Sequence, residues 1–233
     1  MNQHTAKQFD AELESVRARV LQMGGIVEHQ ITRAIDALSS GDIELCDQII
    51  DADHRVNALE IEIDEQCSHI IARRQPTAID LRMILAVIKT ITDLERIGDE
   101  ASKIARMAKN LHQRDQIQLP RYRDIKHVAN IAVDMLRQSL DAFARLDVVV
   151  PAKVVRLDEQ VDEEFKSIVR KLITFMMEDP RTISSSLEIL WVAKAIERIG
   201  DHAKNMSEYV VYLVKGKDVR HVSAEEIERE VGT

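Results

Sequence analysis

The sequence predicts an all-α protein made of two tandem, pseudo-symmetric three-helix bundles. Hydrophobic residues make up 45% and charged residues 31% of the chain, whereas aromatic residues make up only 3%, with seven glycines and four prolines. This composition is typical of long helices and too poor in turn residues for a β-sandwich. The pentapeptide Glu-Arg-Ile-Gly-Asp occurs at 95–99 and again at 197–201, 102 residues apart. A duplication of that length is too long for a solenoid repeat and suits two bundles.

Helix-breaking residues divide the chain into six periodic segments. These breakers are Gly41, Pro76, Pro120, Pro151, Pro180 and Gly216. Between them, apolar residues recur every three or four positions, which is the pattern of amphipathic helices that pack in a bundle. The helices are predicted to cover about 8–39, 42–74, 77–113, 121–146, 152–177 and 181–214.

The polar stretch 112–123 is the one plausible boundary in mid-chain. The predicted division is a first bundle over 1–115, a second bundle over 120–215, and a charged C-terminal tail over 216–233. Within the tail, Ser223-Ala224-Glu225-Glu226 has the pattern of a capping box and can start one short helix. The rest of the tail is expected to be loosely ordered.

Charge and cysteine content restrict the class of protein. The net charge of −8, without a basic stripe, argues against nucleic-acid binding. Cys46 and Cys67 lie on one predicted helix, roughly 30 Å apart, and therefore cannot pair with each other. The N-terminal residues lack the apolar region of a secretory signal, and no apolar run approaches the length of a membrane span. We therefore expect a cytoplasmic protein.

The first repeated pentapeptide places two acids on one face of the third predicted helix, toward the bundle interior or its edge. Glu95 and Asp99 are four residues apart, one turn along the same face. On the second predicted helix, Asp53 interrupts an apolar face, and Asn57 lies one turn further on. If the two helices form an antiparallel hairpin about Pro76, Asn57 lies 19 residues before it and Glu95 19 after, whereas Asp53 and Asp99 are each 23 away. The polar pairs should therefore meet at matching levels.

The second half repeats this arrangement about Pro180. Asp162 is 18 residues before that proline and Glu197 is 17 after it. Asp158 is 22 before and Asp201 is 21 after. Facing carboxylates repel one another and are costly to bury unless a cation lies among them. Oxygen ligands without cysteine favour Mg, Ca, Mn or carboxylate-bound iron.

A simpler interpretation is that these acids face solvent and pair with nearby bases. The candidate bases are Lys103, Arg96, Arg198 and Lys204. One Glu-x-x-x-Asp pair would favour that interpretation, but the repeat and the matching levels favour metal. Gly98 and Gly200 each cost about 1 kcal/mol relative to alanine inside a helix. Either a close helix crossing or the need to keep the acidic site uncrowded explains them, and the sequence leaves both open.

The whole set of motifs resembles the PhoU family of phosphate-transport accessory proteins. The resemblance covers roughly 8–214 and rests on both pentapeptides and four further motifs. These are Asp53-His54-Arg55-Val56-Asn57, Gln75-Pro76, Asp80-Leu81-Arg82 and Met177-Glu178-Asp179-Pro180-Arg181. It implies two pseudo-symmetric bundles and multinuclear metal clusters held by Glu/Asp-x-x-x-Asp motifs, with Mg, Mn or Fe as the expected metals.

The resemblance also implies metal ligands, a role and partners. The positions that match the family's ligands are Asp53, Asn57, Glu95, Asp99, Asp158, Asp162, Glu197 and Asp201. The implied role is negative regulation of the phosphate-starvation response and of phosphate uptake. The implied partners are the ATPase subunit of a phosphate ABC transporter and a sensor histidine kinase, so the membrane is reached only through partners. A homodimer is also implied. Asn57 stands where the second half has an acid, and Glu100 where it has His202, so the two sites need not be equally occupied.

Enzymatic alternatives lack parts in this sequence, so we expect a protein that is not an enzyme. A ferritin-like di-iron protein would need Glu-x-x-His at two places, and the chain has none. Neither a glycine-rich phosphate loop nor a nucleophile elbow is present. The stronger rival is a purely structural helical adaptor without metal, which leaves the acids as solvated helix edges.

Overall fold

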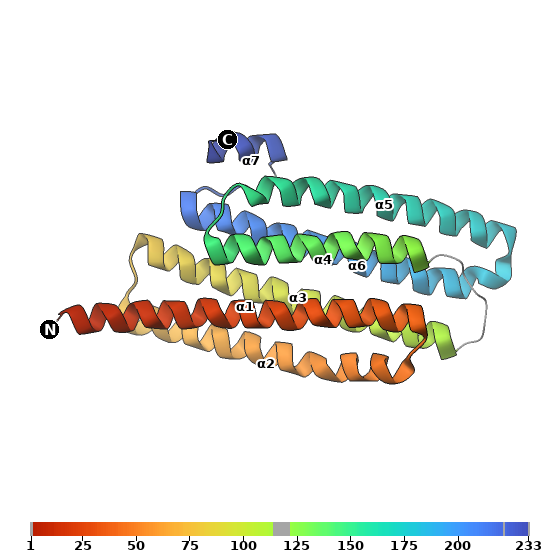
Figure 1. The fold of residues 1–233 in the computed structure, drawn as a ribbon, viewed down its shortest axis with the longest axis horizontal. Helices are drawn as coiled ribbons and strands as arrows, with labels where there is room; N and C mark the ends of the chain where they lie inside the picture. Colours follow the sequence, from red (N-terminus) through yellow and green to blue (C-terminus); the bar gives the residue numbers. More distant parts are fainter. Residues whose placement is uncertain (1, 114–121, 221, 233) are drawn as a thin grey trace.

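A computed structural model describes residues 2–113, 122–220 and 222–232 of the protein, and the secondary structure in these ranges is helical. The elements are α1 (Asn2–Ser40), α2 (Ile43–Arg74), α3 (Ala78–Gln113), α4 (Tyr122–Arg145), α5 (Val150–Glu178), the 3-10 turn η1 (Pro180–Thr182), α6 (Ile183–Lys215) and α7 (Ala224–Val231). Helices α1–α3 form one bundle and α4–α6 a second that lies alongside it (Figure 1). The predicted all-α fold with two three-helix bundles is confirmed.

The ends of α2 and α5 form the turns of the two hairpins that were predicted from the positions of Pro76 and Pro180. Helix α2 ends at Arg74 and is capped by Gln75, whose φ of 48° lies in the left-handed region and whose N–H donates to the carbonyl of Ile71. Helix α5 ends at Asp179, whose side chain accepts a hydrogen bond from the N–H of Arg181. Since a proline follows each of these residues, neither helix can continue. The register of α2 on α3, and of α5 on α6, is set at these turns.

The two bundles share one continuous hydrophobic core, and α3 packs against α6 at its centre (Figure 1). Two polar contacts also join these helices. Arg198 Nη1 lies 3.2 Å from Oε1 of Glu100, and His202 Nδ1 lies 2.7 Å from Oδ1 of Asp93. The predicted boundary between the first and second bundles falls at 115–120, outside the described residues, so the division into 1–115, 120–215 and 216–233 stays a prediction.

The C-terminal tail packs on the second bundle. Val219, Ala224 and Ile227 are at most 3% exposed and form a small apolar cluster with Ala152 and Val155. The predicted short helix is confirmed as α7, with a capping box between Ser223 and Glu226. The expectation that the rest of the tail is loosely ordered is wrong for Val219 and Val222, because Val219 belongs to the apolar cluster and Val222 packs against it.

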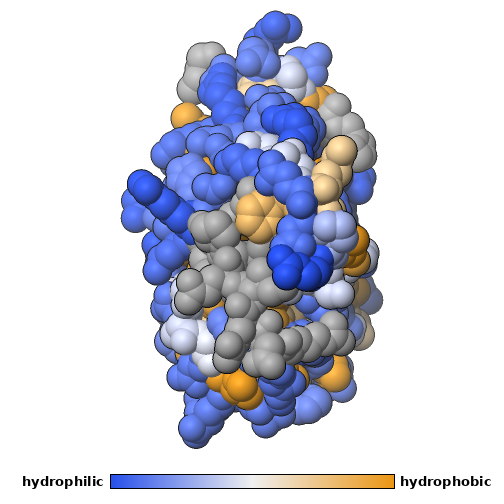
Figure 2. Space-filling view, turned by 90° about the vertical axis from the view of Figure 1, so that its right-hand side faces the viewer, coloured by the Kyte–Doolittle hydropathy of each residue, from blue (hydrophilic) through white to orange (hydrophobic). Residues whose placement is uncertain are grey.

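The surface is mainly hydrophilic at the end of the molecule where α1 turns into α2 and α5 into α6, with small apolar patches between the charged side chains (Figure 2). Of the helices described, none is both long and apolar enough to cross a membrane. Cys46 and Cys67 are buried and free, as their predicted separation required.

Candidate functional site

The first acidic cluster, which we define as Asp53, Asn57, Glu95 and Asp99, is assembled by the α2–α3 hairpin. Burial raises the pKa of Asp53 above its usual value, and the charge of Asp99 raises it further. The pKa of Glu95 is raised mainly by burial and then by the charges of Asp99, Glu60 and Asp53. The three carboxylates that counting from Pro76 paired are therefore electrostatic neighbours, and Glu60 adds its charge to theirs.

Two oxygens of the first acidic cluster lack partners. Asp53 is 9% exposed, and neither its Oδ1 atom nor Oδ1 of Asn57 has a hydrogen-bond partner. Within the ranges that the structure describes, no salt bridge reaches Asp53, Glu95 or Asp99. Buried polar atoms are nearly always paired, so each orphaned oxygen calls for an explanation. A hard cation bound by these oxygens would supply one.

The second acidic cluster, Asp158, Asp162, Glu197 and Asp201, is assembled in the same way by α5 and α6. Burial is the main cause that raises the pKa of Asp158, and the charges of Asp162 and Glu197 add to it. The pKa of Asp201 is raised by burial, then by the charges of Glu197 and Asp158. All four predicted residues are therefore electrostatic neighbours.

Two lysines distinguish the second acidic cluster from the first. Lys204 donates a hydrogen bond to Oδ2 of Asp158, and this contact opposes the rise of the Asp158 pKa. The Nζ atom of Lys194 lies 2.6 Å from both carboxylate oxygens of Glu197. The alternative in which acids pair with nearby bases is thus realised here for Lys204. Lys194 was missed, although its position three residues before Glu197 is a spacing at which helical side chains meet.

Neither acidic cluster is gathered around a single point. In the described part of the chain, no group of three or more His, Cys, Asp or Glu side chains is placed to hold a metal ion. The donor set of the first acidic cluster still fits a hard cation, because its oxygens include two that are orphaned and its carboxylates repel one another. In the second acidic cluster, ammonium groups already neutralise two of the four acids.

The residues that follow each pentapeptide's Asp join the two bundles. Glu100 is 2% exposed and accepts from Lys103 at 2.8 Å as well as from Arg198. His202 contacts Asp93 across the interface between α3 and α6. Glu100 and His202 thus have partners of their own instead of extending the acidic clusters.

Sequence reasoning also missed Gln30 and Ser102. Gln30 is 4% exposed, and both polar atoms of its amide lack partners. Ser102 is fully buried, and its hydroxyl lies near enough to Asp53 to oppose the rise of that carboxyl's pKa. For Gln30 a signal existed, since it interrupts the buried face formed by Val27, Ile31 and Ala34 on α1.

Comparisons with known proteins match this chain to one family over most of its length. The model of the PhoU domain matches residues 20–108 and 125–210. The chain is 47% identical to the phosphate-specific transport system accessory protein PhoU homolog of Pseudomonas aeruginosa, across 99% of this chain and 95% of that protein. It is 46% identical to the phosphate-specific transport system accessory protein PhoU of Escherichia coli K12, across 98% and 94%.

Two solved structures share the fold. The crystal structure of PhoU from Pseudomonas aeruginosa superposes with a TM-score of 0.86 at 47% identity, covering 90% of this chain and all of that one. The phosphate transport system regulatory protein PhoU from Streptococcus pneumoniae gives a TM-score of 0.83 at 27% identity, covering 91% and 99%. With two matching domains and near-complete coverage by relatives, the chain belongs to the PhoU family.

Proposed function

We propose that the protein is a metal-binding regulatory adaptor of a phosphate transport system. In this role it represses the phosphate-starvation response and phosphate uptake by linking the ATPase subunit of a phosphate ABC transporter to a sensor histidine kinase. The observation that carries the proposal is the 47% identity, over nearly the full length of both chains, to a phosphate-specific transport system accessory protein. The protein would act in the cytoplasm as a homodimer and reach the membrane only through its partners.

The electrostatics of the first acidic cluster support the metal-binding part of the proposal. The carboxylates of Asp53, Glu95 and Asp99, together with the side-chain amide oxygen Oδ1 of Asn57, would hold Mg, Mn or Fe. A bound cation would reverse the local sign of the charge and make this face attractive to an anionic or carboxylate group of a partner. The chain's own contribution would be to hold these carboxylates close together, and this is supported by the burial and mutual repulsion that raise the pKa values of Asp53 and Glu95.

A docking function without catalysis is consistent with the family. PhoU relatives are named as accessory and regulatory proteins. The sequence shows no motif in which a nucleophile is paired with an oriented base. We therefore propose that the protein is not an enzyme.

The regulatory role is tested in cells that lack their own copy of the gene. Expression of this protein at high phosphate should restore repression of a phosphate-starvation reporter. The double variant Glu95→Ala/Glu197→Ala should fail to restore it while accumulating to the same level. Full repression by the double variant would show that regulation does not use the acidic clusters and would favour the purely structural adaptor.

The partners and the metal are tested with the purified full-length protein. Prepared without a His-tag or chelator, it should contain bound metal by mass spectrometry. In pull-downs it should retain the transporter's ATPase subunit and the kinase's sensor domain, and EDTA should weaken both interactions. If EDTA does not change how much of either partner is retained, the docking face is not organised by metal.

A further inference from the structure

The amide of Gln30 faces the first acidic cluster from a third helix. A Cβ atom placed on Gly98 would lie 3.4 Å from Cγ1 of Val56, 3.5 Å from Oε1 of Gln30 and 3.6 Å from Oδ1 of Asp53. Both oxygens therefore border the same small space, which exists because residue 98 lacks a side chain. Neither oxygen has a hydrogen-bond partner among the described residues, and both residues are more than nine-tenths buried. Two unpartnered oxygens, one of them on a carboxylate that is an electrostatic neighbour of Glu95 and Asp99, are what a cation site would supply.

The same space in the second half is apolar. A Cβ atom on Gly200 would meet Cε and Sδ of Met135 at 3.5 and 3.6 Å, and Cγ1 of Val161 at 3.6 Å. Met135 on α4 thus takes the place that Gln30 takes on α1. A thioether and a methyl group offer no ligand that a hard cation prefers.

The charges around the two spaces also favour a cation in the first half only. Lys204 lies 102 residues after Ser102, the separation of the two pentapeptides, and brings an ammonium group to Asp158. Lys194 neutralises Glu197 and lies 5.5 Å from the ring centroid of Phe165. Phe165 follows Asp162 by three residues, as Glu60 follows Asn57. The second half therefore replaces a hydroxyl and a carboxylate with an ammonium and an aromatic ring.

We propose that Gln30 is a third-helix oxygen ligand of the first acidic cluster, and that the two halves are unequal: the first binds the metal ion, whereas Lys204 and Lys194 take the cation's place in the second. The inference rests on the proposed metal-binding function and deepens it. A neutral amide oxygen extends the donor set without adding repulsion to the carboxylates already present. An internal ammonium group satisfies the second acidic cluster permanently, so that half needs no metal to remain folded.

The test uses chelator-treated full-length protein and Mn²⁺ as the probe, with binding followed by calorimetry and by the electron paramagnetic resonance of free Mn²⁺. Gln30→Met, which copies the second half, should weaken the tightest Mn²⁺ binding about tenfold or more. The matched variant Met135→Gln introduces the same polar group at the equivalent place and should leave that binding unchanged. Circular dichroism confirms that each variant is folded before titration.

A second comparison tests the inequality itself. Glu95→Ala should abolish the tightest Mn²⁺ binding, whereas Glu197→Ala should leave it within twofold of the wild type. Equal losses from the two variants, or unchanged affinity in Gln30→Met, would overturn the inference while leaving metal binding intact. A wild-type protein that binds neither Mn²⁺, Mg²⁺ nor Fe²⁺ would overturn the proposed metal-binding function, and this inference with it.

Discussion

Lys204 on α6 donates a hydrogen bond to Asp158 on α5, inside the second acidic cluster. Asp158 is 6% exposed, and burial alone would favour its neutral form. The residue at the position equivalent to Lys204 in the first half is Ser102, which brings no charge to Asp53. The two halves, which match the same family domain, thus compensate the burial of an aspartate in different ways.

Replacing Lys204 should expose the energetic cost of this burial. In Lys204→Ser, Asp158 stays buried without its cation, and the free energy of unfolding at pH 7 should fall by about 3 kcal/mol, the low end for a broken buried pair, since Lys204 is partly exposed. Urea denaturation in EDTA measures the change. The matched variant is Lys103→Ser, because its partner Glu100 keeps Arg198 at 3.2 Å and the loss should be below about 1 kcal/mol. Equal losses would show that the Lys204 contact is no stronger than a surface pair.

The two helix-interior glycines should separate stability from metal binding. A Cβ atom at Gly98 or Gly200 would meet its nearest neighbours at 3.4 to 3.6 Å, which is ordinary van der Waals contact. Gly98→Ala and Gly200→Ala should therefore each raise the free energy of unfolding of the metal-free protein by about 0.5–1 kcal/mol through helix propensity. Gly98→Ala places a methyl group beside the oxygens of Gln30 and Asp53 as well as Val56, whereas the three nearest atoms at Gly200 are all apolar, so only Gly98→Ala should weaken Mn²⁺ binding in calorimetry. Equal Mn²⁺ affinities would mean that both glycines serve helix packing alone.

The helix boundaries and the hairpin register could be predicted because they depend on local chemistry. Pro76 and Pro180 stop a helix wherever they occur, and the number of residues from each proline sets which side chains meet. The predicted end of the second helix, at 74, coincides with the end of α2 at Arg74. The coupling of Asp53 with Asp99 follows from the same count.

The contacts that distinguish the halves could not be predicted in this way. Whether Lys204 reaches Asp158, or Gln30 faces Gly98, depends on how far each helix is rotated about its own axis within the bundle. A few tens of degrees move a side chain from the core to its edge, and helical periodicity does not fix rotation that finely. The tail was misjudged for another reason: its apolar residues Val219, Val222 and Ile227 are too few and too irregularly spaced to show a period.

Glu208 should make the stability of the protein depend on pH. Its side chain is 4% exposed, and burial raises its pKa to about 7, against the opposing charge of Lys204. As pH rises from about 4.5, the unfolded chain releases this proton first, so the native state binds more protons and the free energy of unfolding falls until pH is above about 7. The full loss is on the order of 3 kcal/mol.

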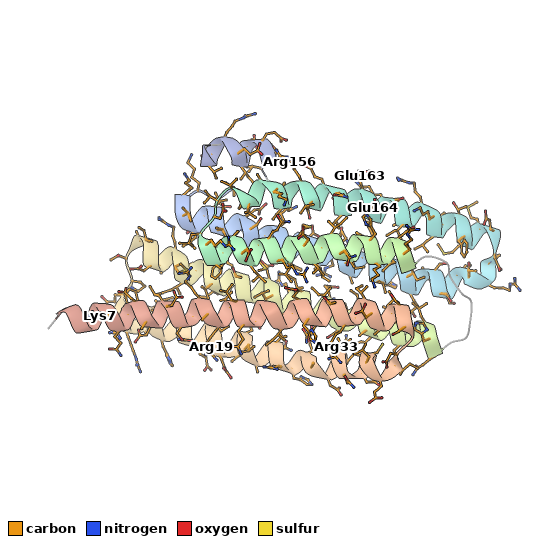
Figure 3. All side chains as sticks on the ribbon, viewed as in Figure 1. Lys7, Arg19, Arg33, Arg156, Glu163 and Glu164 are labelled. Atoms are coloured by element: carbon orange, nitrogen blue, oxygen red, sulfur yellow. The ribbon has the colours of Figure 1, made fainter. Side chains whose placement is uncertain are left out.

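Glu208→Gln cannot ionise and should escape this loss. Urea denaturation in EDTA at pH 4.5 and at pH 7.5 should show the variant gaining on the wild type by up to about 3 kcal/mol between the two conditions. Glu163→Gln removes a carboxylate from the solvent-facing side of α5 (Figure 3) and serves as the control for a change in net charge. A difference between Glu208→Gln and the wild type that is the same at both pH values would contradict the prediction.

The tail should open locally, without unfolding of the bundles. Ile227 is fully buried against α5, and Arg156 on α5 lies beneath α7, where Nη2 is 2.7 Å from Oε1 of Glu228 (Figure 3). Ile227→Ala removes most of this apolar contact, which costs at least about 2 kcal/mol, so amide exchange of α7 should accelerate roughly thirtyfold. Hydrogen exchange followed by mass spectrometry measures it, with Arg229→Ala on the exposed side of α7 as the matched control. Because α7 packs mainly on α5 in the described part of the chain, the urea midpoint of the bundles should barely move. A midpoint that falls in step with α7 protection would mean that the tail and the bundles unfold as one cooperative unit.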